Sequence, residues 1–139
     1  MRRCVVILLV LWIAVAAPPA VTAATRAPTI AMSIVHFVRG CHVWSKGSKV
    51  LGPATTITTK PGARLTIRIS CPMDFDLVQT AGPRLALGRP RLVAGTTRTI
   101  VFRKAGVYKL VAKNVQTSEE VGLETLGEDN TLRLTVRVR

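Results

Sequence analysis

The chain has 139 residues, of which 48% are hydrophobic, and it carries a formal net charge of +13. This length suits one ordinary domain and is too short for two. The positive charge favours anionic partners, but only 4% of the residues are aromatic, which leaves few platforms for stacking bases. Together with the export signal described next, this composition excludes an intracellular nucleic-acid-binding role.

The N-terminus has the organisation of a secretory signal peptide. Arg2 and Arg3 give a positive start, the run over 5–16 is almost wholly apolar, and small residues at 21–23 supply a cleavage site. The apolar run is shorter than the roughly 20 residues that a transmembrane helix needs. We therefore expect residues 1–23 to be removed, no transmembrane segment to remain, and the mature chain to be exported, either to the periplasm or as a secreted protein.

Cleavage changes both the charge and the cysteine count. It removes two of the 20 basic residues and none of the seven acidic ones, so the mature chain stays near +11. Cys4 leaves with the signal peptide, and Cys41 and Cys71 remain. An even number of cysteines in an oxidising compartment makes a disulfide the default. Residues 24–30 indicate a flexible leader, followed by one domain over 31–139.

The mature chain has the pattern of short strands separated by turns. In 65–71 the residues Leu65, Ile67, Ile69 and Cys71 fall on one face, and polar residues alternate with them on the other. About seven such segments, with turn signals roughly every 8–12 residues, predict an all-β fold, an antiparallel Greek-key β-sandwich. The expected strands cover 34–38, 55–59, 65–71, 75–79, 97–103, 107–112 and 132–138.

Residues 113–130 interrupt this pattern, and they hold five of the seven acidic residues. We expect them to form either a long loop over one end of the sandwich or a single helical turn. The positive charge gathers instead on the polar faces of the strands. Such a basic face suits an anionic envelope polymer or lipid surface. Its members are Arg64, Arg68, Arg133, Arg137 and Arg139.

Two stretches, KPGARLTIRI at 60–69 and FRKAGVYKLVAKN at 102–114, together with the final LRLTVRV, resemble the cupredoxins. The resemblance covers roughly residues 30–139. It implies a copper-binding β-sandwich in which one His follows an early strand, and Cys, His and often Met follow the AGVY hairpin. It also implies a redox or metal-delivery protein partner.

The usual copper ligands of that family are missing from this chain. No Cys or His occurs after position 71, and Met73-Asp74-Phe75-Asp76 stands where the first ligand His is expected. A blue-copper centre needs two imidazoles and a thiolate in a trigonal set. We therefore exclude a standard blue-copper centre at its usual position.

A different soft-metal site remains compatible with the residues. Cys41, His42, Cys71 and Met73 offer thiolate, imidazole and thioether ligands, which suit copper and above all Cu(I). The alternative is a plain disulfide between Cys41 and Cys71, which closes a loop of about 30 residues and stabilises the fold by about 2–4 kcal/mol. Both interpretations require the two segments to meet at one end of the sandwich, and the sequence leaves both open.

Two further side chains near these candidates have less specific interpretations. His36 lies in an apolar stretch and is expected to pack as a structural histidine. Trp44 is expected either in the core or on a surface that binds a partner. That partner surface would include Trp44, Arg133 and Arg137.

No catalytic motif stands out in the sequence. Asp74 and Asp76 share one face of a strand, but with so much basic charge nearby we expect them to form ion pairs rather than to act as acid and base. The sequence therefore predicts a binding protein and not an enzyme. It is either an exported cupredoxin-like protein with an atypical copper site, or a disulfide-stapled sandwich that binds a protein or an anionic envelope polymer.

Overall fold

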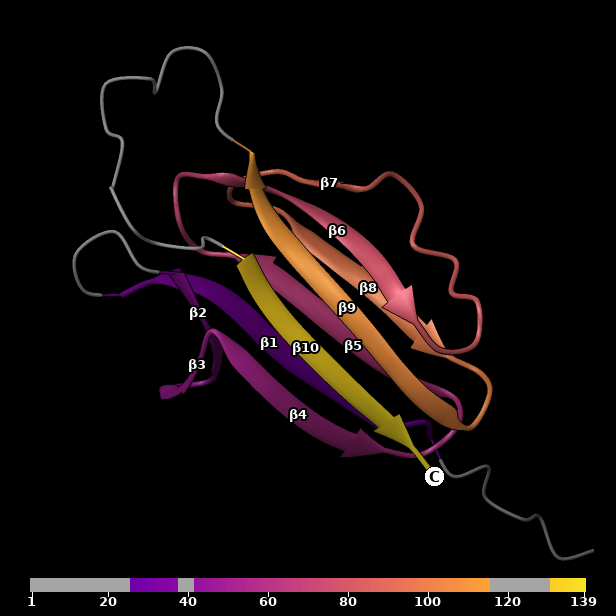
Figure 1. The fold of residues 1–139 in the computed structure, drawn as a ribbon. Coiled ribbons are helices and arrows are strands. Elements are labelled where there is room, and N and C mark those ends of the chain that lie inside the picture. The colour runs from indigo at the N-terminus through magenta and orange to yellow at the C-terminus, as the bar shows by residue number, and fades with distance from the viewer. Residues whose placement is uncertain (1–25, 38–41, 116–130) are drawn as a thin grey trace, which may run out of the picture.

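The computed structural model describes residues 26–37, 42–115 and 131–139, and every regular element in this part of the chain is a β-strand (Figure 1). The strands form two five-stranded sheets that pack as a sandwich, which confirms the all-β prediction. No helix in these ranges could span a membrane. The strands are β1 (Thr29–His36), β2 (His42–Lys46), β3 (Lys49–Gly52), β4 (Ala54–Thr59), β5 (Ala63–Ile69), β6 (Asp74–Ala81), β7 (Arg91–Leu92), β8 (Thr97–Phe102), β9 (Gly106–Val115) and β10 (Thr131–Val138).

Each sheet combines antiparallel pairs with one parallel pair. The first sheet has the order β3-β2-β1-β5-β8, and the second has the order β4-β10-β9-β6-β7. β1 runs parallel to β5, with Ile34 opposite Ile69, and β4 runs parallel to β10, with Thr56 opposite Thr135. The prediction of a wholly antiparallel sandwich is therefore wrong for these two pairs, and both sheets are mixed.

The alternation of apolar and polar residues explains why these segments form strands with one buried face. In β5, Leu65, Ile67 and Ile69 are at most 1% exposed, whereas Arg64 and Arg68, which have the opposite parity, are exposed. β10 shows the same period of two. Because successive side chains of a strand point to opposite faces, each sheet has an apolar inner face and a polar, largely basic outer face.

The core lies between the two inner faces, and aromatic side chains fill much of it. Trp44, Phe75, Phe102 and Tyr108 are its largest fully buried side chains. Phe102 and Tyr108 pack edge to face with their ring centroids 5.0 Å apart. The Tyr108 hydroxyl donates to the Lys104 carbonyl at 2.6 Å, so the β8–β9 turn is tied to the core.

The strand boundaries differ from the prediction in identifiable ways. β2, β3 and β7 bring the number of strands to ten, where about seven were expected. β2 is buried at four consecutive positions and therefore shows no alternation, while β3 and β7 are too short for a pattern to show. β1 begins at Thr29, inside the expected leader, because its pairing with β5 starts at Arg64.

Two of the predicted segments fall wholly or largely outside the described residues. The signal peptide expected at 1–23 lies outside the described residues, and so do residues 116–130 of the acidic segment. Residues 113–115 of that segment belong to β9, which therefore extends three residues beyond its predicted end.

Candidate functional site

One end of the sandwich, which we call the loop pole, brings together residues that are far apart in the sequence. β1 ends there at His36, and β2 begins there at His42, the cross-strand partner of His36. β5 is parallel to β1 and ends at the same pole, where the Ser70 N–H donates to the Ile34 carbonyl at 2.9 Å. β9 ends and β6 begins there too, with Phe75 opposite Asn114 (Figure 1).

Two histidines pack against each other at the loop pole. The rings of His36 and His42 meet edge to face with centroids 5.3 Å apart. His42 is only 4% exposed, and its ring also contacts Phe75 of the second sheet at 5.3 Å. His36 is exposed although its ring packs against His42, so the expectation of a packed structural histidine holds only for that one contact. The alternation of residues in β1 could have indicated this contact, because His36 lies on the same side of the strand as the inward-facing Met32 and Ile34.

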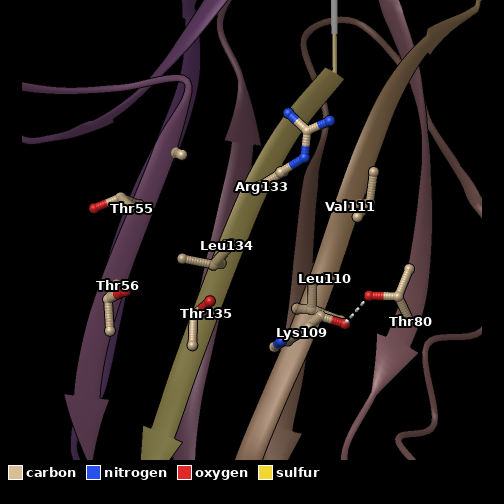
Figure 2. A pocket seen from close by; sticks show the side chains of 10 residues that line it. Thr55, Thr56, Thr80, Lys109, Leu110, Val111, Arg133, Leu134 and Thr135 are labelled. Carbon is tan, nitrogen blue, oxygen red and sulfur yellow. Dashed lines mark hydrogen bonds between the residues drawn. The ribbon is translucent and has the colours of Figure 1, made fainter.

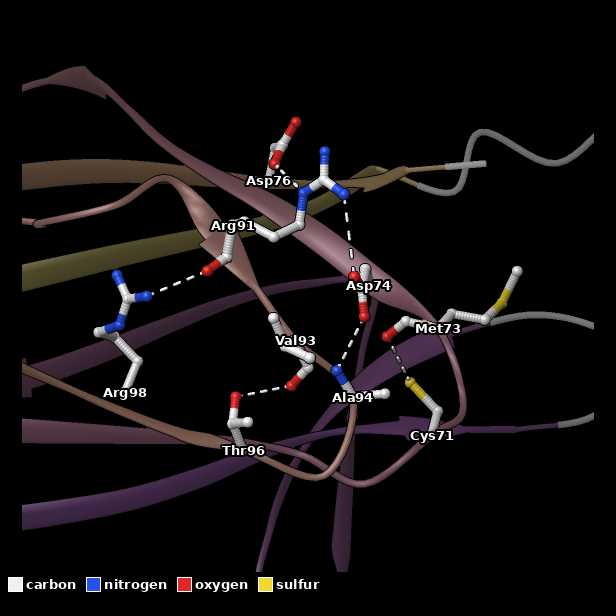
Figure 3. Close-up of polar contacts among 9 residues, drawn as sticks. All are labelled: Cys71, Met73, Asp74, Asp76, Arg91, Val93, Ala94, Thr96 and Arg98. Atoms are coloured by element: carbon white, nitrogen blue, oxygen red, sulfur yellow. Dashed lines mark hydrogen bonds and ion pairs between the residues drawn. The ribbon is translucent and has the colours of Figure 1, made fainter. Parts of the chain in front are cut away.

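Cys71 is buried directly after the inward-facing row of β5. Its side chain is 6% exposed, and its sulfur donates to the Met73 carbonyl at 3.9 Å (Figure 3). Burial raises the pKa of the Cys71 thiol above its ordinary value, because the charged thiolate loses its hydration. Cys71 is therefore a protonated thiol at neutral pH unless a cation takes the place of the proton.

Met73 and Asn114 form a second polar contact at the same pole. The Asn114 side-chain amide donates to the Met73 sulfur at 3.6 Å, and Figure 3 shows the thioether extending away from Cys71. The Asn114 Oδ1 atom is buried and has no hydrogen-bond partner among the described residues. From the sequence alone Asn114 has no role at this site, since its nearness to Met73 depends on the pairing of β6 with β9.

The two aspartates of β6 are structural. Arg91 pairs with Asp76 at 2.8 Å and lies 3.8 Å from Asp74. The other oxygen of Asp74 accepts the Ala94 N–H at 2.9 Å (Figure 3). The prediction that these carboxylates are ion-paired is confirmed, and together they anchor the 91–94 segment to the start of β6.

The fourth candidate ligand, Cys41, lies in 38–41, outside the described residues. The disulfide with Cys71 and the four-residue metal site therefore both stay predictions. Within the described part of the chain, no group of three or more His, Cys, Asp or Glu side chains is placed to hold a metal ion. A complete site at this pole thus needs a thioether, Cys41 or both in addition to Cys71 and His42.

Trp44 is not a surface residue. Its side chain is completely buried opposite Ile34 in the core. The expectation that it contributes to a partner surface is therefore corrected, and the core interpretation fits instead. The Trp44 Nε1 atom is buried and has no hydrogen-bond partner among the described residues.

Arg133 and Arg137, the other members of that expected surface, lie exposed on the outer face of the second sheet. Arg133 lines a hollow of about 650 Å³ together with residues of β4, β10, β9 and β6, and Figure 2 shows the side chains around it. The Thr80 hydroxyl donates to the Lys109 carbonyl at 3.3 Å in this hollow. A partner-binding role for the two arginines stays a prediction.

Comparison with known proteins finds similarity only at the level of structure. No protein-family model matches the chain, and no curated protein sequence matches it either. Among solved structures, the cysteine protease inhibitor EhICP2 from Entamoeba histolytica is 13% identical, with a TM-score of 0.45 over 84% of this chain and 100% of that one.

Copper proteins are also among the similar structures. Amicyanin from Paracoccus versutus is 14% identical, with a TM-score of 0.38 over 85% of this chain and 86% of that one. Reduced rusticyanin is 15% identical, with a TM-score of 0.43 over 84% and 82% of the two chains.

Proposed function

We propose that this chain is an exported copper-binding protein that holds Cu(I) at the loop pole through Cys71 and His42, with Cys41 and Met73 as further ligands. One observation carries the proposal. His42 begins β2 and Cys71 follows β5, the two neighbours of β1, and both side chains are buried at the same pole. Soft and intermediate donors from segments remote in sequence therefore lie at the same end of the sandwich.

The chemistry of this donor set fits Cu(I). Thiolate, thioether and imidazole are the protein ligands that a soft monovalent ion prefers. A bare thiolate is disfavoured at the buried position of Cys71, but a bound cation compensates the charge that burial penalises. Binding then releases the thiol proton, so copper affinity should rise with pH.

The residues around the donors have supporting roles. Phe75 packs on the ring of His42 and excludes water from one side of it. His36 packs against the same His42 ring from the exposed end of β1. Met73 is the weaker ligand candidate, because its sulfur already accepts the Asn114 hydrogen bond and extends away from Cys71. Bound copper would supply a one-electron couple or serve as cargo for a metal-delivery partner.

A competition titration tests the proposal. Reduced mature chain, residues 24–139, is titrated with Cu(I) in the presence of a chromophoric Cu(I) chelator. We expect one Cu(I) per chain, and we expect Cys71→Ser to weaken binding by at least about tenfold, since a soft anionic ligand is replaced by a hydroxyl. Met73→Leu should weaken binding less, and Met32→Leu, a matched change at a core methionine, should leave it unchanged.

Two results would overturn the proposal. One is the absence of stoichiometric binding, or binding that Cys71→Ser does not alter. The other is a freshly exported chain whose intact mass is lower by two hydrogen atoms than that of its reduced form. That mass would identify the Cys41–Cys71 disulfide and favour the stapled sandwich that binds a protein partner.

A further inference from the structure

The outer edge of β4 is unpaired along its whole length in the described structure. β4 is the edge strand of the second sheet and pairs with β10 alone among the described residues. The N–H groups of Arg133 and Arg139 donate to the carbonyls of Pro53 and Thr59. In a parallel ladder, alternate residues of a strand bond to the same neighbour, so the odd-numbered residues of β4 face β10.

The even-numbered residues of β4 therefore direct their backbone groups away from the sheet. Ala54, Thr56 and Thr58 each present one N–H and one C=O to the open edge. Natural edge strands usually carry a charge or a proline that blocks pairing with another chain. The β4 sequence, ATTITT, contains neither.

A basic groove runs beside this edge. It has a volume of about 770 Å³ and lies between β4 on one side and β1, β2 and β3 on the other. Its apolar lining includes Ile30, Leu51 and Ile57, and no acidic residue lines it. Its cationic residues are Arg26, Lys46, Lys49 and Lys60, and none of these four forms an ion pair with a described residue.

We propose that the free edge of β4 is a docking strip for an extended acidic segment of a partner protein, which adds to the second sheet as a further strand. The three outward-facing residues supply a ladder of backbone hydrogen bonds, and alternate side chains of the segment enter the groove. The four cations select negative charge. This inference does not depend on the proposed copper site, which lies at the loop pole and uses other residues.

The cations of the groove and the outward-facing backbone groups of β4 together favour a peptide over other ligands. A second copy of this chain paired through the same edge would bring two sets of these cations together, which is repulsive. A polysaccharide or lipid headgroup would use the cations but not the ladder of N–H and C=O groups on β4. An acidic extended peptide is the occupant that uses both features.

The test uses a fluorescein-labelled seven-residue peptide in which glutamate and valine alternate. The control peptide has the same sequence with every backbone amide nitrogen methylated, so it keeps its charge but has no N–H on either edge to donate to the ladder. We expect the first peptide to bind the mature chain at low salt and the methylated peptide to bind at least about tenfold more weakly, since tenfold corresponds to about 1.4 kcal/mol, the size of one net hydrogen bond.

Variants of the chain separate the backbone from the charge. Thr56→Pro removes one outward N–H and should weaken peptide binding by about tenfold, while Lys49→Glu should weaken it several-fold through charge. Arg103→Glu, a charge reversal on an exposed residue outside the groove, should have little effect.

The proposal is wrong if neither peptide binds, or if both peptides bind equally. Equal binding would indicate a polyanion surface that reads charge alone. Should Thr56→Pro fail to fold, the methylated peptide against the unaltered chain still decides the question. A further expected signature is a shift of the amide signals of Thr56 and Thr58, and not of Thr55 and Ile57, when the peptide is added.

Discussion

The backbone N–H groups of β4 point alternately to β10 and to the open edge of the sheet. This alternation predicts that proline is tolerated at one position of the strand and not at the next. Thr56 points its N–H to the open edge, whereas Ile57 lies on the parity that bonds to β10. Proline has no N–H to donate and is accepted on edge strands where that group would face solvent. Thr56→Pro should therefore leave the ladder intact, and Ile57→Pro should break it.

The expected magnitudes follow from the groups affected. Ile57→Pro loses one ladder hydrogen bond, about 1 kcal/mol net, and leaves a β10 carbonyl without its donor, about 1–3 kcal/mol more. Thr56→Pro removes only a backbone N–H that faces solvent and restricts φ at one residue of an edge strand. We therefore expect the free energy of unfolding to fall by about 1 kcal/mol or less. The two variants should differ by about 2 kcal/mol in the free energy of unfolding.

Urea unfolding of both variants and of the unaltered chain measures this difference. With a slope of about 1–3 kcal/mol per molar urea for a small domain, the two midpoints should differ by roughly 1 M. Hydrogen exchange gives an independent check, because the amides of Thr55 and Ile57 should be protected and those of Thr56 and Thr58 should exchange fast. Equal stabilities, or the opposite pattern of protection, would refute this assignment of inward and outward N–H groups along β4.

Three further predictions follow from single contacts. Tyr108→Phe should destabilise the chain by about 1 kcal/mol in urea, since it loses the bond to the Lys104 carbonyl, which water can reach; no loss would mean that the contact does not form in solution. Gly82→Ala should lower the free energy of unfolding by about 2 kcal/mol or more, because φ is +102° and a Cβ would strike the backbone of β9. At Gly47 a Cβ enters open space, so Gly47→Ala should lower it less. Cys71 should be alkylated by iodoacetamide more slowly at pH 8.5 than a free thiol, which peptide mass spectrometry measures. The free energy of unfolding should fall as pH rises above the ordinary thiol pKa, because the folded state keeps the Cys71 proton that the unfolded state releases. Urea midpoints at several pH values measure this second effect.

The strands that the sequence predicted well are those with a single buried face. β5 and β10 show strict alternation, and their predicted and observed ranges agree within two residues at each end. β2 was missed for the opposite reason. His42 to Ser45 are all buried, so side chains on both faces of this strand are covered and the period of two disappears.

The candidate site was only partly predictable, since its contacts depend on which strands pair. The position of Cys71 and His42 at the same pole follows from the pairing of β5 and β2 with β1, which no local pattern encodes. The contact of His36 with His42 could have been inferred in part, because His36 lies on the same side of β1 as the inward-facing Ile34. The contact between Asn114 and Met73 could not, because it requires the register of β6 on β9. Local sequence determines which face a side chain takes, and long-range pairing determines its neighbours.

The long-range strand order and direction, which the sequence did not reveal, create both proposed sites. Had β5 been an antiparallel neighbour of β1, it would end at the opposite pole, and Cys71 would lie a full strand length from His42. An interior position in either sheet would give β4 a neighbour on both sides. Instead β4 crosses to the second sheet and joins β10 at the margin, which leaves its other edge unpaired among the described residues. An antiparallel neighbour in place of β5 would bury the same apolar residues while separating the soft donors, whereas the open edge of β4 depends on its position in the strand order.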